Sequence, residues 1–113
     1  MKYSESLKKY KDFSLVYKEE KSFANKYLVM YIRENGSEKN RLGISVSKKV
    51  GNSVVRHRLT RLIRESYRLQ EERFRCGIDI VVIARASAKG RTYQEVESAL
   101  IHLGHLHNII DQG

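Results

Sequence analysis

The spacing of apolar residues at the start of the chain predicts a helix. From residue 6 to residue 17, aromatic and aliphatic side chains recur at steps of three and four, which places them along one helix face. These residues are Tyr10, Phe13, Val16 and Tyr17. Ser4 or Ser6 is suited to cap this helix, because a serine hydroxyl can accept a hydrogen bond from a free backbone N–H of the first turn.

Two segments with alternating apolar residues follow and predict a pair of strands. Residues 27–33 are rich in β-forming side chains, with one face wholly aliphatic and Tyr31 on the other. Residues 41–47 alternate in the same way, and the sequence Asn-Gly-Ser at 35–37 lies between the two segments. This arrangement predicts an antiparallel hairpin, and it leaves Tyr31 on the more accessible face.

The second half of the chain predicts two helices that flank a buried strand. Asn52 or Ser53 is suited to cap a helix that runs to about residue 72, and a final helix extends over residues 92–109. Between them, residues 78–84 form a continuous apolar run apart from Asp79, as expected for a central strand buried on both faces. The order α-β-β-α-β-α predicts an α+β fold, a small α-β sandwich with a single sheet covered by helices. Without proline or repeats, the 113 residues are expected to form one domain.

The net charge of the chain restricts its possible functions more than the pattern of apolar residues does. The chain carries 22 Lys or Arg against 13 Asp or Glu, a net charge of +9. A small domain with this excess repels itself, so we expect it to bind a polyanion. Cys76 is the only cysteine, which excludes an intrachain disulfide and a cysteine-based zinc site and fits a reducing compartment. No signal-like N-terminus or membrane-length apolar segment is found, so we expect a cytoplasmic protein without membrane contact.

Residues 48–68 hold most of this charge. They contain seven Lys or Arg and a single acid, Glu65, for a net charge of +6. Helical spacing places an aliphatic stripe on one side of this segment, made of Val55, Leu59, Leu62, Ser66 and Leu69. The opposite side carries His57, Arg61, Arg64 and Arg68, and Arg56 and Arg58 flank the stripe. Like charges at these spacings destabilise a helix, so the pattern predicts a helix that packs on the sheet and presents arginines to phosphates.

Other candidate chemistry is sparse. His102, His105 and His107 cluster in the last predicted helix, but His107 points away from the other two and no Cys or carboxylate lies close in sequence. Surface histidines are therefore favoured over a metal site. Asp79 has no partner carboxylate in sequence, and we find no catalytic triad, phosphate loop or paired carboxylates. We assign no catalytic residue and no metal ligand to the chain.

The basic segment closely resembles the signature of the bacterial ribonuclease P protein family. The matching residues are Lys48-Lys49-Val50-Gly51-Asn52, Val55-Arg56-His57-Arg58 and Arg61-Leu62-Ile63-Arg64-Glu65. One position departs from the pattern, because His57 stands where the family has Asn, which puts an Asn-specific hydrogen bond at this place in question. The similarity also covers residues 7–25, 41–47 and 79–85, and so extends over nearly the whole chain.

The resemblance implies a role in an RNA-catalysed reaction. In this family the RNA subunit uses Mg²⁺ to hydrolyse a phosphodiester of precursor tRNA, which leaves the mature 5′ end. The protein binds this ribonuclease P RNA and holds the 5′ leader of the precursor tRNA in a cleft between the first helix and the sheet, with no obligate protein partner. The matched RNA-binding residues are Lys48, Lys49, Asn52, Arg56, Arg58, Arg61, Arg64 and Arg68. The matched residues of the leader-binding cleft are Phe13, Tyr17 and Tyr31.

The residues alone and the family resemblance lead to different expectations on two points. The family fold has a left-handed β-α-β crossover, whereas the sequence alone favours the usual right-handed form. Aromatic rings in a basic groove are a common grip on single-stranded RNA, yet from the residues alone Phe13 is equally well interpreted as a core side chain.

Two other functions share parts of this pattern. A stand-alone nucleic-acid-binding module, such as a ribosome-associated protein, would use the basic helix but would not need the aromatic cleft. A membrane-surface protein would need exposed apolar residues opposite the charges, whereas Val55, Leu59 and Leu62 are expected in the core. Similarity over the full length favours the ribonuclease P subunit over both.

Overall fold

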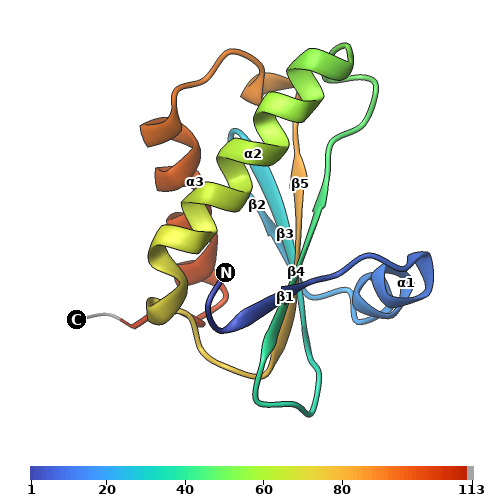
Figure 1. Cartoon of the computed structure of the whole chain (residues 1–113), viewed down its shortest axis with the longest axis vertical. Helices are drawn as coiled ribbons and strands as arrows, with labels where there is room; N and C mark the ends of the chain where they lie inside the picture. Colours follow the sequence, from blue (N-terminus) through green and yellow to red (C-terminus); the bar gives the residue numbers. More distant parts are fainter. Residues whose placement is uncertain (112–113) are drawn as a thin grey trace.

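Two helices cover one face of a five-stranded sheet and a third helix covers the other, in a computed structural model that describes residues 1–111 (Figure 1). The sheet has the order β1-β4-β5-β3-β2. Its strands are β1 (Ser4–Ser6), β2 (Ser22–Ala24), β3 (Leu28–Glu34), β4 (Asn40–Ser45) and β5 (Ile78–Ala84). The helices are α1 (Tyr10–Lys18), α2 (Ser53–Gln70) and α3 (Tyr93–Leu106), with short 3-10 turns at Glu71–Arg73 and Ala86–Ala88. The predicted α-β sandwich with a single sheet is confirmed.

Strand β5 lies at the centre of the sheet. It pairs antiparallel with β3 and parallel with β4, and all of its residues except Ile83 are buried. The predicted hairpin is therefore wrong, because β5 lies between β3 and β4 although a short turn joins those two strands. An apolar strand is shielded from water only when it has a partner strand on each edge and a layer of side chains on each face. With β3 and β4 paired to each other, β5 could pair with only one of them.

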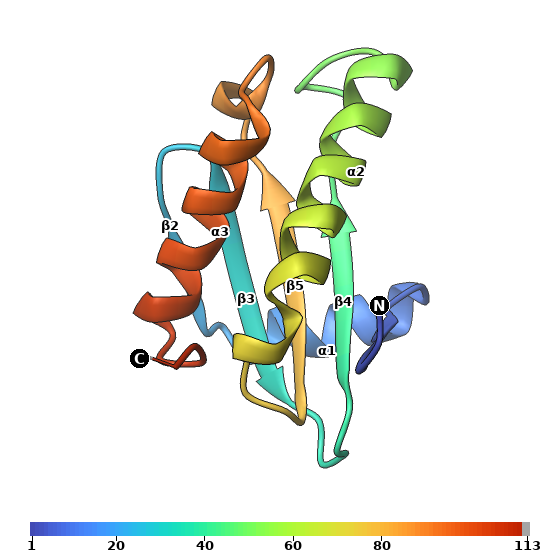
Figure 2. The ribbon, with the colours of Figure 1, turned by 60° about the vertical axis from the view of Figure 1, so that its left-hand side comes forward.

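The connection from β4 through α2 to β5 is left-handed. In Figure 2, with α2 and α3 in front and both strands pointing up, β5 lies to the left of β4. About 98% of such connections are right-handed, so the sequence alone predicted the wrong hand and the family resemblance implied the observed one. Since β5 lies on the β3 side of β4, a right-handed connection would carry α2 to the face that α1 occupies.

The chain begins in an extended segment rather than in a helix. Ser4–Ser6 pairs with β4 as a parallel edge strand, and α1 starts only at Tyr10, with Lys9 as an N-cap that makes no side-chain hydrogen bond. The predicted helix start at residue 6 and its serine cap are therefore wrong. Leu7 continues the strand, because its backbone N–H donates to the carbonyl of Leu42 at 2.8 Å.

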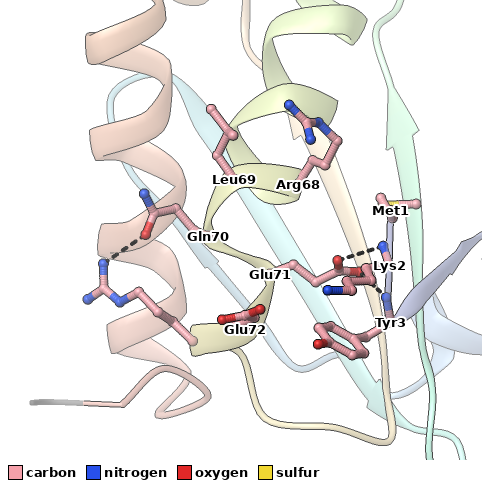
Figure 3. Close-up of a pocket in the computed structure, with 9 residues that line it drawn as sticks. Met1, Lys2, Tyr3, Arg68, Leu69, Gln70, Glu71 and Glu72 are labelled. Atoms are coloured by element: carbon pink, nitrogen blue, oxygen red, sulfur yellow. Dashed lines mark hydrogen bonds between the residues drawn. The ribbon is translucent and has the colours of Figure 1, made fainter.

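Glu71 fixes the course of this extended segment. Its carboxylate accepts hydrogen bonds from the backbone N–H groups of Lys2, at 2.8 Å, and Tyr3, at 3.0 Å (Figure 3). Burial by itself raises the pKa of Glu71, but the hydrogen bonds that it accepts outweigh burial and hold the pKa below its ordinary value. Pairing with β4 keeps residues 4–7 extended, and α1 starts only after them.

The main core lies between the sheet and the layer formed by α2 and α3. From α2 it takes Leu59 and Ser66, as predicted, and also Ile63 and Tyr67, which the predicted stripe did not include. Leu69, which the stripe did include, is 54% exposed. The buried face is rotated because the inner side of α2 meets the extended N-terminal segment, where the Tyr67 hydroxyl lies 2.7 Å from that of Ser4.

Helix α1 packs on the opposite face through a smaller apolar cluster. Leu7, Val16 and Val81 are buried there, and Phe13, Tyr17, Tyr31 and Ile83 pack around them. Tyr10, which the helical spacing placed on the same face, is 88% exposed. With nine residues, α1 is shorter than helices that are stable in isolation. Its position therefore depends on contacts with the sheet.

A buried carboxylate on β5 ties α1 to the sheet. Asp79 accepts two hydrogen bonds from Arg41 of β4, from Nε at 2.9 Å and from Nη2 at 2.8 Å. On the other side, Arg33 Nη1 of β3 lies 3.6 Å from Asp79 Oδ2, and the three residues are in register across the sheet. The same arginines reach α1, where Arg41 lies 3.4 Å from Asp12 and Arg33 lies 3.9 Å from Glu19. The charged partners of Asp79 are therefore arginines on neighbouring strands.

We expect Asp79 to make the fold less stable in acid. Burial raises the pKa of Asp79, but the hydrogen bonds from Arg41 and Asn35 and the charges of Arg41 and Arg33 outweigh it and hold the pKa below the ordinary value of 3.8. A carboxyl group with a lowered folded-state pKa stabilises the fold above its unfolded-state pKa, and this contribution is lost as the pH falls through the folded-state pKa. The free energy of unfolding, measured by urea titration, should therefore decrease steeply below about pH 4.

The variant Asp79→Asn tests this assignment. It should lower the free energy of unfolding at neutral pH by about 3 kcal/mol, because two arginines keep their charges beside a neutral amide. It should also make the decrease of this free energy below about pH 4 less steep. Glu5→Gln, which removes only an exposed ion pair with Lys39, is the control. If the free energy of unfolding fell as steeply below about pH 4 in Asp79→Asn as in the unmodified chain, the acid sensitivity would belong to other carboxyl groups.

Candidate nucleic-acid interface

The outer face of α2 carries a row of cationic and imidazole side chains, which we call the arginine ridge. It consists of His57, Arg58, Arg61, Arg64 and Arg68, all of them exposed. Shallow hollows open between these side chains along the helix. The predicted division of α2 into a charged outer side and an apolar inner side is confirmed for these residues.

The ridge begins at a well-ordered helix N-terminus. Asn52 is the N-cap, and its Oδ1 accepts a hydrogen bond from the backbone N–H of Val55 at 3.0 Å, as predicted. Lys48 and Lys49 lie exposed in the preceding turn, which the buried Val50 anchors. The free N–H groups and aligned peptide dipoles of a helix N-terminus attract anions. The turn therefore extends the positive field of the ridge.

The arginines of the ridge differ in how far they are neutralised. Arg68 is ion-paired with Glu65, with Nε 2.9 Å from Oε2, and this hydrogen-bonded carboxylate raises the pKa of Arg68. Within the described part of the chain, Arg61 and Arg64 form no ion pair. A guanidinium without a carboxylate partner keeps its donors for a phosphate, which it can bind bidentately.

Arg56 and Arg58 were both predicted to flank the apolar stripe, and they differ in position. Arg58 is exposed and donates to the backbone carbonyl of Arg91 at the start of the α3 layer, at 3.0 Å. Arg56 is half-buried, and its Nε is buried without a hydrogen-bond partner among residues 1–111. In this conformation Arg56 is therefore less accessible to a ligand than the arginines of the ridge.

On the other face of the sheet, Phe13, Tyr17 and Tyr31 form a group that we call the aromatic cluster. The ring centroids of Phe13 and Tyr17 are 6.4 Å apart, and those of Tyr17 and Tyr31 are 5.0 Å apart with the rings nearly perpendicular. All three side chains are half-buried. Burial, followed by the proximity of Tyr31, raises the pKa of Tyr17. The predicted accessible side of β3 at Tyr31 is confirmed, because the aliphatic residues of that strand are buried on its other face.

Gly43 allows Phe13 to lie directly on β4. A Cβ atom at this position would stand 2.7 Å from Phe13 Cζ, well inside van der Waals contact. Gly43 was not among the residues predicted for the site, although a glycine inside an alternating strand is a known signal for close approach of another group. The link from Asp79 through Arg41 and Arg33 to α1 was not predicted either, because only the strand register reveals it.

The arginine ridge and the aromatic cluster lie on opposite sides of the sheet. Figure 1, in which the sheet is seen nearly edge-on, shows α2 on one side of it and α1 on the other. The sequence predicted both groups but not their separation.

The three histidines of the last helix region do not converge. His102 Nδ1 lies 3.1 Å from Asn25 Nδ2, whereas His107 Nε2 lies 2.8 Å from the carbonyl oxygen of Met30. Burial lowers the pKa of His107. In residues 1–111 no group of three His, Cys, Asp or Glu is placed to hold a metal ion.

Sequence comparison identifies a family over most of the chain. Residues 1–107 match the family model described as Ribonuclease P. A ribonuclease P protein component of Lachnoclostridium phytofermentans is 64% identical over 107 residues, which are 95% of this chain and 92% of that protein. One from Alkaliphilus metalliredigens is 54% identical over 103 residues, 91% of this chain and 93% of that protein.

Solved structures agree with the sequence matches. The RNase P protein of Staphylococcus aureus superposes with a TM-score of 0.87 at 37% identity, covering 96% of this chain and 99% of that one. The protein from Thermotoga maritima gives a TM-score of 0.80 at 38% identity, covering 88% and 94% of the two chains. Among the described residues, no helix combines the length and the apolar character that a membrane span requires.

Proposed function

The chain belongs to the ribonuclease P protein family, and from this premise we propose how its two surfaces serve the enzyme. The protein is a subunit of ribonuclease P, which processes the 5′ end of tRNA, and it acts with ribonuclease P RNA and precursor tRNA. We propose that residues 1–113 are one RNA-binding domain, in which the basic surface of α2 binds the catalytic RNA and the aromatic cluster binds the 5′ leader.

The observation that carries this proposal is the unneutralised charge on α2. Neighbouring cations such as Arg61 and Arg64 repel each other at a cost of a few tenths of a kcal/mol per pair, and neither forms an ion pair within residues 1–111. Bound phosphates would remove this cost and release counterions from the RNA. The proposed RNA-binding set is Lys48, Lys49, Asn52, Arg56, Arg58, Arg61, Arg64 and Arg68.

The half-buried state of the aromatic cluster supports the assignment of the leader. A ring that is fully buried cannot stack on a base, and a ring that is fully exposed is not held in place. Phe13, Tyr17 and Tyr31 lie between these limits, packed on one another and on the sheet. Stacking on such rings contributes about 1–3 kcal/mol per base without strong sequence preference, which suits leaders of varied sequence.

The proposed division of labour leaves the chemistry to the RNA subunit. We assign the Mg²⁺ ions of the reaction to that RNA, as membership of the ribonuclease P family implies. The residues of this chain bind and orient the two RNAs, and none acts as acid, base or nucleophile. We also propose that the protein acts in the cytoplasm, where precursor tRNA is found.

Reconstitution tests the assignment as a whole. Precursor tRNA should be cleaved at low Mg²⁺ concentration only when a bacterial ribonuclease P RNA and this protein are both present, with mature 5′ ends as the product. The protein alone should leave the precursor intact. Binding of RNA without any assistance to cleavage would instead favour a stand-alone RNA-binding module.

We expect single arginines of the ridge to contribute phosphate contacts. Arg61→Ala and Arg64→Ala should each weaken binding to ribonuclease P RNA and lower the slope of log K against log salt concentration by about one unit. Folding should be unaffected, because both side chains are exposed. Arg75→Ala is a matched control, since Arg75 is exposed outside the ridge and pairs with Glu34. Unchanged affinity and slope across a salt series would remove these arginines from the interface.

We expect Phe13 to distinguish precursor from mature tRNA. Phe13→Ala should weaken binding of leader-bearing precursor by about tenfold, in line with the loss of one stacked base, and should affect mature tRNA little. Phe23→Ala, which removes a phenyl ring from β2 outside the cluster, is the control. Equal losses for precursor and mature tRNA would assign Phe13 to the core alone.

A further inference from the structure

Both ends of α1 are connected to the same buried carboxylate. Asp12, in the first turn, lies 3.4 Å from Arg41, and Glu19, the C-cap residue, lies 3.9 Å from Arg33. Arg41 and Arg33 flank Asp79 from the two neighbouring strands, at 2.8 Å and 3.6 Å from its Oδ2. We call the two connections, Asp12–Arg41 and Glu19–Arg33, the α1 tethers.

The tether through Glu19 does not serve the formation of the helix itself, whereas the negative charge of Asp12 lies in the first turn, where the helix dipole favours it. A negative charge at the C-terminal end of a helix opposes the helix dipole, so Glu19 is unfavourable for an isolated α1. The N-cap Lys9 makes no side-chain hydrogen bond, and the nine-residue helix is too short to be stable alone. What the tethers can determine is the place of α1 on the sheet.

Asp79 holds the anchors of the tethers through contacts that do not involve α1. Arg41 and Arg33 have only 29% and 27% of their side chains exposed, and Asp79, fully buried between them, holds both. An arginine that is already fixed in one conformation loses little further entropy when it pairs with a carboxylate. The two ends of α1 thus meet preorganised cations on the sheet.

The tethers adjoin the aromatic cluster. Phe13 follows Asp12 directly and lies on Gly43 of β4. Tyr17 precedes Glu19 by two residues, and its ring meets the edge of Tyr31 at 5.0 Å. A shift of either end of α1 therefore changes the spacing between rings carried by the helix and the ring carried by the sheet.

We propose that Arg41 and Arg33, held by Asp79, are positioning residues that set the spacing between α1 and the sheet and so determine how well the aromatic cluster accepts single-stranded RNA. They act through α1 and do not touch RNA themselves. This inference rests on the proposed binding of the leader at the aromatic cluster.

The double variant Asp12→Asn/Glu19→Gln removes both tethers with little change of shape. Both residues are at least partly exposed, and Asp79 with its two arginines is left intact, so the fold should persist. The matched control is Glu5→Gln/Glu34→Gln, which removes the exposed pairs with Lys39 and Arg75. Since the control changes the net charge equally, any general electrostatic effect on RNA binding appears in both variants.

The measurements use the enzyme reconstituted with ribonuclease P RNA. In the tether variant, the preference for leader-bearing precursor over mature tRNA should fall by about fivefold relative to the control, as expected for the loss of two partly exposed ion pairs. Affinity for the RNA subunit should be the same in both variants. Hydrogen exchange of the α1 amides in the protein should be faster in the tether variant than in the control.

The other outcomes separate this inference from the proposed function. If the unmodified enzyme prefers precursor and the tether variant keeps that preference, the tethers do not position α1 and the inference is overturned, while the leader assignment stands. If the unmodified enzyme shows no preference for the leader, the leader assignment fails and the inference fails with it. If the tether variant, but not the control, also lost affinity for the RNA subunit to the same extent as it lost preference for the precursor, the inference would be overturned. The tethers would then act on the whole fold.

Discussion

The structure depends on keeping both faces of β5 away from water. This strand is apolar from Ile78 to Ala84 apart from Asp79, and it lies between β3 and β4 with helices above and below. Its insertion separates two strands that a short turn connects, and it requires α2 and α3 on one face and α1 on the other. The left-handed path of α2 follows, because the right-handed path leads to the face of α1. The energetic basis is hydrophobic burial, which is proportional to the apolar area removed from water.

The same arrangement separates the two RNA-binding surfaces that we propose. Because α2 buries its aliphatic side on one face of the sheet, its arginines point outward on that side of the molecule. Because α1 and β3 meet on the other face, the aromatic cluster lies there. A protein that contacts two RNAs at once benefits from this geometry, since a catalytic RNA on the arginine ridge does not compete for space with a leader at the aromatic cluster.

Asp79 is the exception in the buried strand, and it explains how a short helix is held on an open face. A carboxylate in such a position is costly unless cations and hydrogen bonds compensate it. Arg41, Arg33 and Asn35 provide this compensation, and the two arginines extend the network to α1. Electrostatic contacts thus supplement the small apolar cluster under α1, whereas packing against a large core places α2 and α3.

The sequence by itself determined the features that depend on neighbouring residues. The helical period located α2 with its Asn52 cap and its charged outer side, the alternation in β3 put Tyr31 on the accessible face, and the apolar run interrupted only by Asp79 identified β5. Only the tertiary structure decided which strands pair, why the chain starts as β1, why Tyr67 is buried in place of Leu69, and which cations surround Asp79. The reason is physical. A periodic pattern depends on residues a few positions apart, whereas strand register joins residues that are distant in sequence, such as Arg41 and Asp79. Many registers are compatible with the same local pattern. Burial of β5 selects one of them, and the positions of α1, the aromatic cluster and the arginine ridge follow from that choice.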